Sequence, residues 1–482
     1  MVLATQQDSI DDLCKATASA LSKAYASGAI SPVEVAKATL NRAEEINGQL
    51  NAFTIIDHEG AFQAAKNSEQ RWNDNQPLSP VDGIPITIKD IVHCGMDTRY
   101  GSATTPDVSN FPDAPSVKLL RAAGVVMLGL TNSPEFGWKA VTDNPKFGIT
   151  RNPWDTSKTP GGSSGGAAVA AATGAGALHL GTDGGGSIRI PASFTGIVGH
   201  KPSFGRVPAH PASAFGTVAH IGPMARTVGD TALMLNAMQG RDIRDWNQGF
   251  SPVDPVNPTS IDFKSLRIGF WKDPSIGSND AEVDALIMAT VGDFELSGAI
   301  IEELSLPMEG ELLDVFYRHW LVGAANRLST IDKSDYEKLD PGFLQAAETG
   351  AQYSSVERMQ AEISRSDYGV VMDQLLQKFD YIISPTVPIP AFDAGVNVPK
   401  GSDYESWVEW STFSYPINLS QQPACSVPCG TTSAGMPVGL QIIGARGNDE
   451  AVLSAALTYE QMYPERFMFP NGKWPSQANG TA

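Results

Sequence analysis

The residues best suited to chemistry in this chain lie between positions 159 and 202, where glycine, small residues and hydroxyl groups are most concentrated. Two Gly/Ser-rich turns, 161–166 and 184–187, enclose an alanine-rich run at 167–172, predicted to be helical, and a short apolar run at 177–181. Glycine has no Cβ, so such turns let the backbone approach a ligand closely and direct several N–H groups to one point. We therefore expect the active centre here, with the two turns facing each other.

A lysine ends a strand-like segment upstream of these turns. The segment 83–90 (GIPITIKD) is rich in β-branched residues and alternates in polarity, which predicts a strand that presents Lys89 at its end. Most lysines in this position are solvated, because burying an ammonium group is expensive. The interpretation of Lys89 therefore depends on the motifs around it.

The two turns and the lysine segment resemble motifs of the amidase signature hydrolases. GGSSGG is followed by GTDGGGSIRIP, with Ser163 and Ser187 24 positions apart, and GIPITIKD resembles the lysine motif of that family. The resemblance covers nearly the whole chain, except the segments near 240–262 and 305–375. The further matching runs are TNSPEF at 131–136, GHKPSFGRVP at 199–208, GPMARTVGD at 222–230, SPTVPIP at 384–390 and GMPVGLQIIG at 435–444.

The resemblance implies an amidase that uses neither a cofactor nor a metal ion. It assigns Ser187 as the nucleophile, Ser163 as the bridging serine that relays protons, and Lys89 as the terminal base. A free lysine is protonated at neutral pH, so Lys89 has to be buried and neutral to accept a proton. The expected oxyanion hole consists of the N–H groups of the second turn, which are those of Gly184, Gly185, Gly186 and Ser187.

The residues around the second turn are expected to support it. Gly184 stands where the family commonly has a side chain, so we expect a looser turn in this chain. Asp183 and Arg189 flank the turn, and we interpret them as a scaffold of ion pairs and backbone hydrogen bonds.

Aromatic residues close to the motifs suggest an apolar acyl or aryl substrate. The tryptophan-bearing stretches 316–320 and 404–411 are more often core than pocket lining. The substrate prediction rests on four other aromatic residues that lie close to the motifs in sequence, which are Phe136, Trp138, Phe147 and Trp154.

Three other functions compete with this interpretation. Residues 162–166 fit G-x-S-x-G, the nucleophile elbow of α/β-hydrolase esterases, which would make Ser164 the nucleophile. An elbow needs a strand directly before it, whereas the preceding segment here, WDTSKTP, is polar and turn-like. The family also includes amidotransferase subunits, which release ammonia from glutamine for a partner that handles transfer RNA. Neither G-x-x-x-x-G-K-[ST] nor G-x-G-x-x-G occurs in the turns, so no nucleotide is predicted.

The composition narrows the choice of partners. With 53 acidic and 34 basic residues the net charge is −19, which disfavours nucleic acids and anionic membrane surfaces. No window reaches the roughly 18 apolar residues of a spanning helix and the N-terminus lacks a secretory pattern, so we expect a cytoplasmic protein. The expected partner is a small-molecule amide, carbamate or ester, and a homodimer is also possible.

The four cysteines are expected to be buried thiols: Cys14, Cys94, Cys425 and Cys429.

Alternating helix and strand signals predict one α/β domain over residues 1–482. N-terminal helices are expected at 8–27 and 31–47, the second begun by the capping box Ser31-Pro32-Val33-Glu34 and ended by Gly48. A catalytic core at about 80–230 is followed by the rest of the same sheet at about 265–465 and a frayed tail at 471–482. Together with the resemblance, this predicts a mixed, mostly parallel central β-sheet covered by helices on both faces. Further helices are expected at 116–123, 282–297, 353–378 and 449–463, and strands at 125–130, 266–271, 381–384, 425–428 and 438–443.

Overall fold

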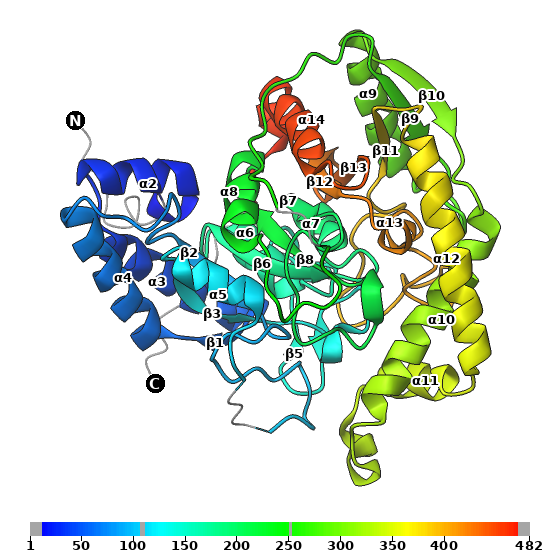
Figure 1. Cartoon of the computed structure of the whole chain (residues 1–482), viewed down its shortest axis with the longest axis horizontal. Helices are drawn as coiled ribbons and strands as arrows, with labels where there is room; N and C mark the ends of the chain where they lie inside the picture. The colour runs from blue at the N-terminus through cyan, green and yellow to red at the C-terminus, as the bar shows by residue number, and fades with distance from the viewer. Residues whose placement is uncertain (1–11, 107–110, 250–252, 471–482) are drawn as a thin grey trace.

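One large β-sheet runs through the molecule. The computed structural model describes residues 12–106, 111–249 and 253–470. Its strands are β1 (Phe53–Ile56), β2 (Pro85–Lys89), β3 (Val126–Thr131), β4 (Asp143–Asn144), β5 (Gly148–Ile149), β6 (Leu178–Asp183), β7 (Val198–Lys201), β8 (His220–Ala225), β9 (Arg267–Trp271), β10 (Ile300–Leu304), β11 (Tyr381–Pro385), β12 (Ala424–Thr431) and β13 (Pro437–Ile443). In the described residues an 11-stranded sheet has the order β1-β3-β2-β6-β8-β7-β12-β13-β11-β9-β10, and β4 pairs with β5 separately (Figure 1).

The sheet is mixed, as the sequence predicts. Parallel pairing occurs in two groups, β3-β2-β6 and β11-β9-β10. The strands between these groups, and β1 at the edge, pair antiparallel. The parallel part of the sheet is therefore confined to those two groups, and the first of them contains the strand that ends at Lys89.

Helices connect the strands and surround the sheet (Figure 1). No helix in the described residues is both long and apolar enough to cross a membrane. The helices are α2 (Ala18–Ser27), α3 (Pro32–Leu50), α4 (His58–Asn73), α5 (Pro115–Ala122), α6 (Gly165–Thr173), α7 (Arg189–Thr195), α8 (Val228–Met238), α9 (Ala281–Leu296), α10 (Glu309–Leu328), α11 (Pro341–Gly350), α12 (Ser355–Leu375), α13 (Tyr415–Ser420) and α14 (Asp449–Met462).

Two separate cores show that both faces of the sheet are covered. Successive side chains of a strand point to opposite faces. In β11, Tyr381 and Ile383 therefore join a core with α8, α9 and α14, whereas Ile382 joins another core with α10, α11, α12 and α13. The expected α/β fold with helices on both faces is confirmed.

The start of α3 follows the sequence prediction, and its end does not. The Ser31 side chain accepts hydrogen bonds from the N–H groups of Val33 and Glu34, and the Glu34 carboxylate accepts one from Ser31 N at 2.8 Å. The helix continues beyond Gly48 to Leu50, because Asn51 adopts the left-handed conformation, with φ of 50°, and caps it.

Several elements were not predicted from the sequence. They include β7, β8 and β10, and the helices α7, α10, α11 and α13. The predicted helix at 8–27 is interrupted at residues 16 and 17, because Thr17 caps the start of α2; residues 12–15 are helical again, and residues 8–11, like the predicted frayed tail, lie outside the described residues.

Candidate active site

Two neighbouring parallel strands bring the predicted residues together. β2 pairs with β6, with Ile88 opposite Leu180, so the carboxyl ends of both strands meet at one edge. Lys89 is the last residue of β2, and Thr182 and Asp183 are the last residues of β6. The first Gly/Ser turn leads into α6, whose first two residues are Gly165 and Gly166, and the second joins β6 to α7. Both turns and Lys89 therefore gather at this edge of the sheet.

Lys89 is fully buried and contacts two hydroxyl groups. Its Nζ lies 2.6 Å from Ser163 Oγ and 2.9 Å from Thr182 Oγ1. Burial lowers the pKa of the Lys89 ammonium well below its usual value, and the Asp183 carboxylate opposes this only in part. The site therefore favours the neutral amine, the form that can accept a proton. Thr182 was not singled out from the sequence, although it precedes Asp183 within the GTDGGGS motif.

The two serines of the first turn have different surroundings. Ser163 lines a pocket together with Ser187 and Thr182. The Ser164 hydroxyl is instead engaged by backbone, because it donates to Thr182 O at 3.1 Å and accepts from Thr182 N at 3.2 Å. The Ser164 hydroxyl therefore joins the first turn to the end of β6. No strand directly precedes this turn, so the nucleophile-elbow geometry that would favour Ser164 is missing from residues 150–164.

The turns face each other as expected. Ser164 N donates to the carbonyl oxygen of Ser187 at 3.1 Å, which joins the first turn to the second. Ser187 is 6% exposed, and it borders the same pocket as Ser163. The pocket thus gives a small molecule access to both hydroxyl groups.

A buried ion pair holds the second turn from behind. Arg189 Nη2 lies 3.0 Å from Asp183 Oδ1 and Arg189 Nε lies 3.0 Å from Asp183 Oδ2, with both side chains fully buried. Burial alone would raise the pKa of Asp183, but the Arg189 guanidinium holds it below its usual range. Asn418 on α13 and Gln441 on β13 accept hydrogen bonds from Arg189, both at 2.6 Å. The predicted scaffold is present and extends to two residues that the sequence did not indicate.

The N–H groups of the second turn do not all point to the same acceptor. Asp183 Oδ1 accepts a hydrogen bond from Gly186 N at 2.8 Å, so this N–H already has a partner inside the protein. The prediction that all four N–H groups form the oxyanion hole therefore needs correction at Gly186. The N–H groups of Gly184, Gly185 and Ser187 have no acceptor within the described residues. These three N–H groups are therefore free to bind an acceptor in the pocket.

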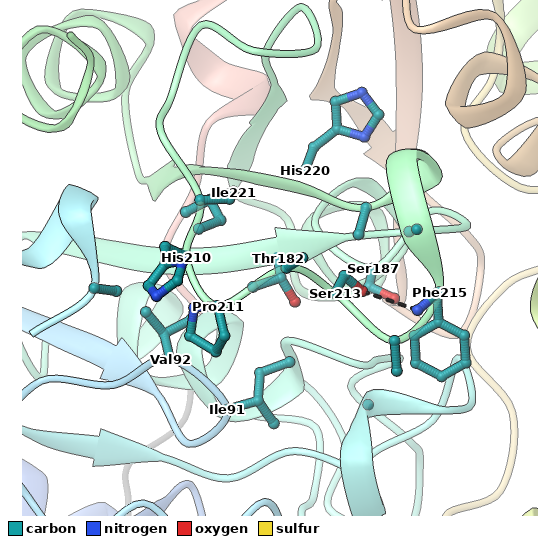
Figure 2. A pocket seen from close by; sticks show the side chains of 18 of the residues that line it. Ile91, Val92, Thr182, Ser187, His210, Pro211, Ser213, Phe215, His220 and Ile221 are labelled. Atoms are coloured by element: carbon teal, nitrogen blue, oxygen red, sulfur yellow. Dashed lines mark hydrogen bonds between the residues drawn. The ribbon is translucent and has the colours of Figure 1, made fainter. Parts of the chain in front are cut away.

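The pocket in front of the second turn has a volume of about 380 Å³ and walls that are largely apolar. Figure 2 shows Thr182 and Ser187 in this pocket, with the side chains of Ile91, Val92 and Phe215 around them. Phe136 also lines it, as the sequence suggested. Trp138, Phe147 and Trp154, the other aromatic residues behind the substrate prediction, are not among its lining residues.

Trp320 on α10 forms part of the pocket wall, although core packing was the favoured interpretation of its stretch. Its ring stacks on Phe215 with 4.0 Å between centroids, and its Nε1 donates to Trp138 O at 2.9 Å. A Cβ at Gly184 would lie 2.8 Å from Trp320 Cζ3. The missing side chain at Gly184 therefore makes room for this indole, and the turn is packed rather than loose.

The structure also places the four cysteines and the side chains that could bind a metal ion. All four cysteines are buried as free thiols, as predicted, and burial raises the pKa of Cys94 to about 11. Within the part of the chain that the structure describes, no group of three or more His, Cys, Asp or Glu side chains is arranged to hold a metal ion.

Comparisons with known proteins identify the family of the chain. A family model described as Amidase matches residues 34–453. The chain is 36% identical to a subunit of glutamyl-tRNA(Gln) amidotransferase from Chloroflexus aggregans, over 91% of this chain and 94% of that protein. It is 33% identical to an acylamidase of Rhodococcus erythropolis, over 93% of this chain and 95% of that protein. The structure of a bacterial aryl acylamidase of the amidase signature family matches with a TM-score of 0.87 at 28% identity, over 95% of this chain and 99% of that chain.

The chain therefore belongs to the amidase family, whose members are the amidase signature enzymes. Membership makes it an amide-cleaving enzyme in the broad sense. Its relatives include both acylamidases and amidotransferase subunits, so the family alone leaves the acceptor and the substrate open.

Proposed function

We propose that the protein is an amidase that hydrolyses the C–N bond of a small amide through an acyl-enzyme on Ser187. The single observation that carries this proposal is the buried contact of 2.6 Å between Lys89 Nζ and Ser163 Oγ, next to a pocket that Ser187 also lines. A neutral lysine joined to a serine hydroxyl is a base with a proton relay attached. Such a pair has little use in a purely structural core.

The proposed reaction begins with attack of Ser187 Oγ on the carbonyl carbon of the amide. The Ser187 proton passes to Ser163 Oγ, and the proton of Ser163 passes to Lys89 Nζ, which becomes an ammonium. The available N–H groups of the second turn stabilise the oxyanion of the tetrahedral intermediate. Lys89 then returns a proton through Ser163 to the leaving nitrogen, and the C–N bond breaks.

Water completes the cycle by hydrolysing the acyl-enzyme. The relay takes a proton from the water molecule as its oxygen attacks the ester carbon, and it returns a proton to Ser187 Oγ as the C–O bond breaks. The products are a carboxylic acid and an amine, and no oxidant or reductant is consumed. Esters and carbamates fit the same cycle, because they need less help with the leaving group.

Covalent labelling tests the assignment of the nucleophile. A sulfonyl fluoride or an organophosphonate should label the wild-type protein at Ser187, and peptide mapping locates the label. Ser187→Ala should take up no label, and Ser163→Ala should label slowly and lose most amide turnover. A label on Ser164 would contradict the proposed mechanism and favour the esterase elbow.

The substrate is proposed to be an acyl or aryl amide with a large apolar part. The support comes from the pocket of about 380 Å³ and from its aromatic wall of Phe136, Phe215 and Trp320. A panel of aromatic anilides, carbamates and esters tests this directly. Activity confined to a small charged amide would contradict it.

A second candidate function is that of an amidotransferase subunit that releases ammonia from glutamine. The 36% identity to the Chloroflexus aggregans protein, which is named as such a subunit, favours it. The two candidates differ in the need for a partner. Hydrolysis of anilides by the purified chain would support the amidase, whereas glutamine hydrolysis that appears only on addition of partner subunits would support the amidotransferase.

We also propose that two copies of the protein form a homodimer through α12. Four apolar side chains on the outer side of this helix are more than half exposed, and they are Val356, Met359, Ile363 and Val370. An antiparallel pair of α12 helices would place Ile363 opposite itself and Val356 opposite Val370, which suits two-fold symmetry. Sedimentation should show a dimer that Ile363→Glu dissociates, and a wild-type protein that is monomeric at all concentrations would rule this interface out.

A further inference from the structure

One face of α10 carries both an aromatic and a cationic side chain into the pocket. Trp320 and Arg327 line it and are seven residues apart, which is close to two helical turns. The rise between them is on the order of 10 Å. Because Trp320 packs over Gly184, Arg327 lies about that distance along the helix from the second Gly/Ser turn.

The guanidinium of Arg327 lies over two aromatic rings and is poorly hydrogen bonded. It lies 4.4 Å from the centroid of the Phe136 ring and 5.3 Å from that of Tyr100. Its Nε is buried without a hydrogen-bond partner, and Nη1 has only Thr330 Oγ1, at 3.5 Å. No Asp or Glu among the described residues forms an ion pair with Arg327.

The nearby carboxylates have hydrogen-bond partners other than Arg327, although the charge of Glu135 opposes in part the lowering of the Arg327 pKa by burial. Glu135 accepts hydrogen bonds from Ser102 Oγ and from Asp340 N, both at 2.6 Å. Asp245, which also lines the pocket, accepts from Ala209 N at 2.8 Å and from Asn247 N at 2.9 Å. The acidic groups around the pocket thus have partners inside the protein, whereas the cation has unused donors.

Arg327 is also the only lysine or arginine among the described residues that line the pocket. Burial lowers the pKa of His93, and it lowers that of His220 further, so these two histidines on the wall favour their neutral forms. Because the chain has a net charge of −19, a partly desolvated cation in the pocket indicates a specific role for Arg327. A guanidinium with free donors binds a carboxylate through two parallel hydrogen bonds.

We infer that Arg327 forms a subsite for a carboxylate carried by the amide substrate. This inference rests on the proposed amidase function and narrows its substrate class to amides with an apolar body and a remote carboxylate. The scissile carbonyl binds at the second turn, the apolar body lies along Trp320 and Phe136, and the carboxylate reaches Arg327.

The test compares matched pairs of substrates that differ only in the carboxylate. On the acyl side, the 4-nitroanilides of dicarboxylic acids from succinyl to suberoyl are compared with those of fatty acids of equal length. On the amine side, 4-acetamidobenzoate is compared with acetanilide. The measured quantity is the ratio of kcat/KM for the carboxylated substrate to that for its neutral partner.

Arg327→Met should lower this ratio about tenfold or more for at least one pair, the size expected when a charge-assisted hydrogen bond is lost. Arg327→Lys should lower it less, because the charge remains while the planar fork is lost. Arg318→Met is the matched control. Arg318 lies on the same helix, pairs with Asp314 at 2.9 Å and does not line the pocket, so its substitution should leave the ratio unchanged.

The outcomes separate this inference from the proposed function. A wild-type protein that cleaves neutral anilides without preferring either carboxylated series would overturn the subsite, and so would a preference that survives in both Arg327 variants. If Arg327→Met fails to fold in a thermal melt, Arg327→Lys decides the question alone. A wild-type protein that cleaves no amide and takes up no label at Ser187 contradicts the proposed function itself.

Discussion

The ionisation of Lys89 can be tested through the stability of the fold, independently of any substrate. In the unfolded chain a lysine titrates at about 10.4. In the folded chain, burial lowers the pKa of Lys89 well below its usual value. Between the folded and the unfolded pKa, the unfolded state therefore binds one proton more than the native state. The contribution of Lys89 to stability is fully present above the unfolded pKa and is lost as the pH falls to the folded pKa.

The expected size follows from proton linkage. Within that window the free energy of unfolding should rise by about 1.4 kcal/mol per pH unit because of Lys89. Lys89→Met removes this term and keeps a side chain of similar length. Lys201, a second buried lysine, has its pKa lowered by burial to about 7 and adds a slope of its own. That slope is present in both proteins, so it cancels in the difference between wild type and variant.

The assay is denaturant unfolding of both proteins at a series of pH values from neutral to about 10. Thr182→Val is the control, because it removes one hydrogen bond to Lys89 and leaves the amine in place, so the pH slope should persist. Amide turnover by the wild type should rise with pH through the same folded pKa, and Lys89→Met should lose about 10²–10⁴-fold in rate. Parallel stability curves for wild type and Lys89→Met would refute the neutral lysine and, with it, the proposed base.

Three further predictions test the surroundings of the site. Ser164→Ala should lower stability by about 1–3 kcal/mol in a thermal melt, because the Thr182 backbone loses its hydroxyl partner, while Ser187 remains reactive to the labelling reagent. Gly184→Ala should lower the free energy of unfolding by about 1–3 kcal/mol, because the new Cβ overpacks against Trp320, and it should slow turnover. Adding Trp320→Leu to this variant should recover part of both losses. No recovery would mean that this contact is unimportant. Asp183→Asn should destabilise the fold by about 3–5 kcal/mol in denaturant unfolding, because the Arg189 charge stays buried without its partner, and an unchanged midpoint would contradict this role.

The parts of the site that the sequence predicts correctly are those carried by short, dense motifs. Lys89 ends its predicted strand and lies close to the turn around Ser187, because the parallel strands β2 and β6 bring their carboxyl ends together. The turn around Ser163 is joined to that turn by the hydrogen bond from Ser164 N to Ser187 O. The helix at 31–47 was predictable for a similar reason, since its capping box is complete within four residues of sequence. In these cases the information is local, and tertiary packing adds to it without changing it.

The parts that were missed depend on contacts between distant segments. α10 packs against α11 and α12 as well as the pocket, so its apolar residues are not confined to one stripe and no clear helical period marks it. Asn418 and Gln441 reach the Arg189 guanidinium from two other elements, and nothing in their local sequence sets them apart. The hydrogen bond from Gly186 to Asp183 depends on the orientation of one carboxylate, which a sequence pattern does not encode.

Gly184 illustrates how such a distant contact changes the meaning of a residue. Taken alone, a glycine in place of a side chain predicts a freer backbone, because the unfolded and folded chains both gain accessible conformations. In the structure the space next to Gly184 holds the edge of the Trp320 ring, and a Cβ at Gly185 would lie 2.9 Å from Phe316 Cζ one turn earlier on α10. The second turn is thus confined on one side by the Asp183 and Arg189 ion pair and on the other by two aromatic rings. Because those rings stack on each other at 5.3 Å, a bulkier residue in the turn has to displace both, and this restraint fixes the N–H groups of Gly184 and Gly185, which we propose as oxyanion donors.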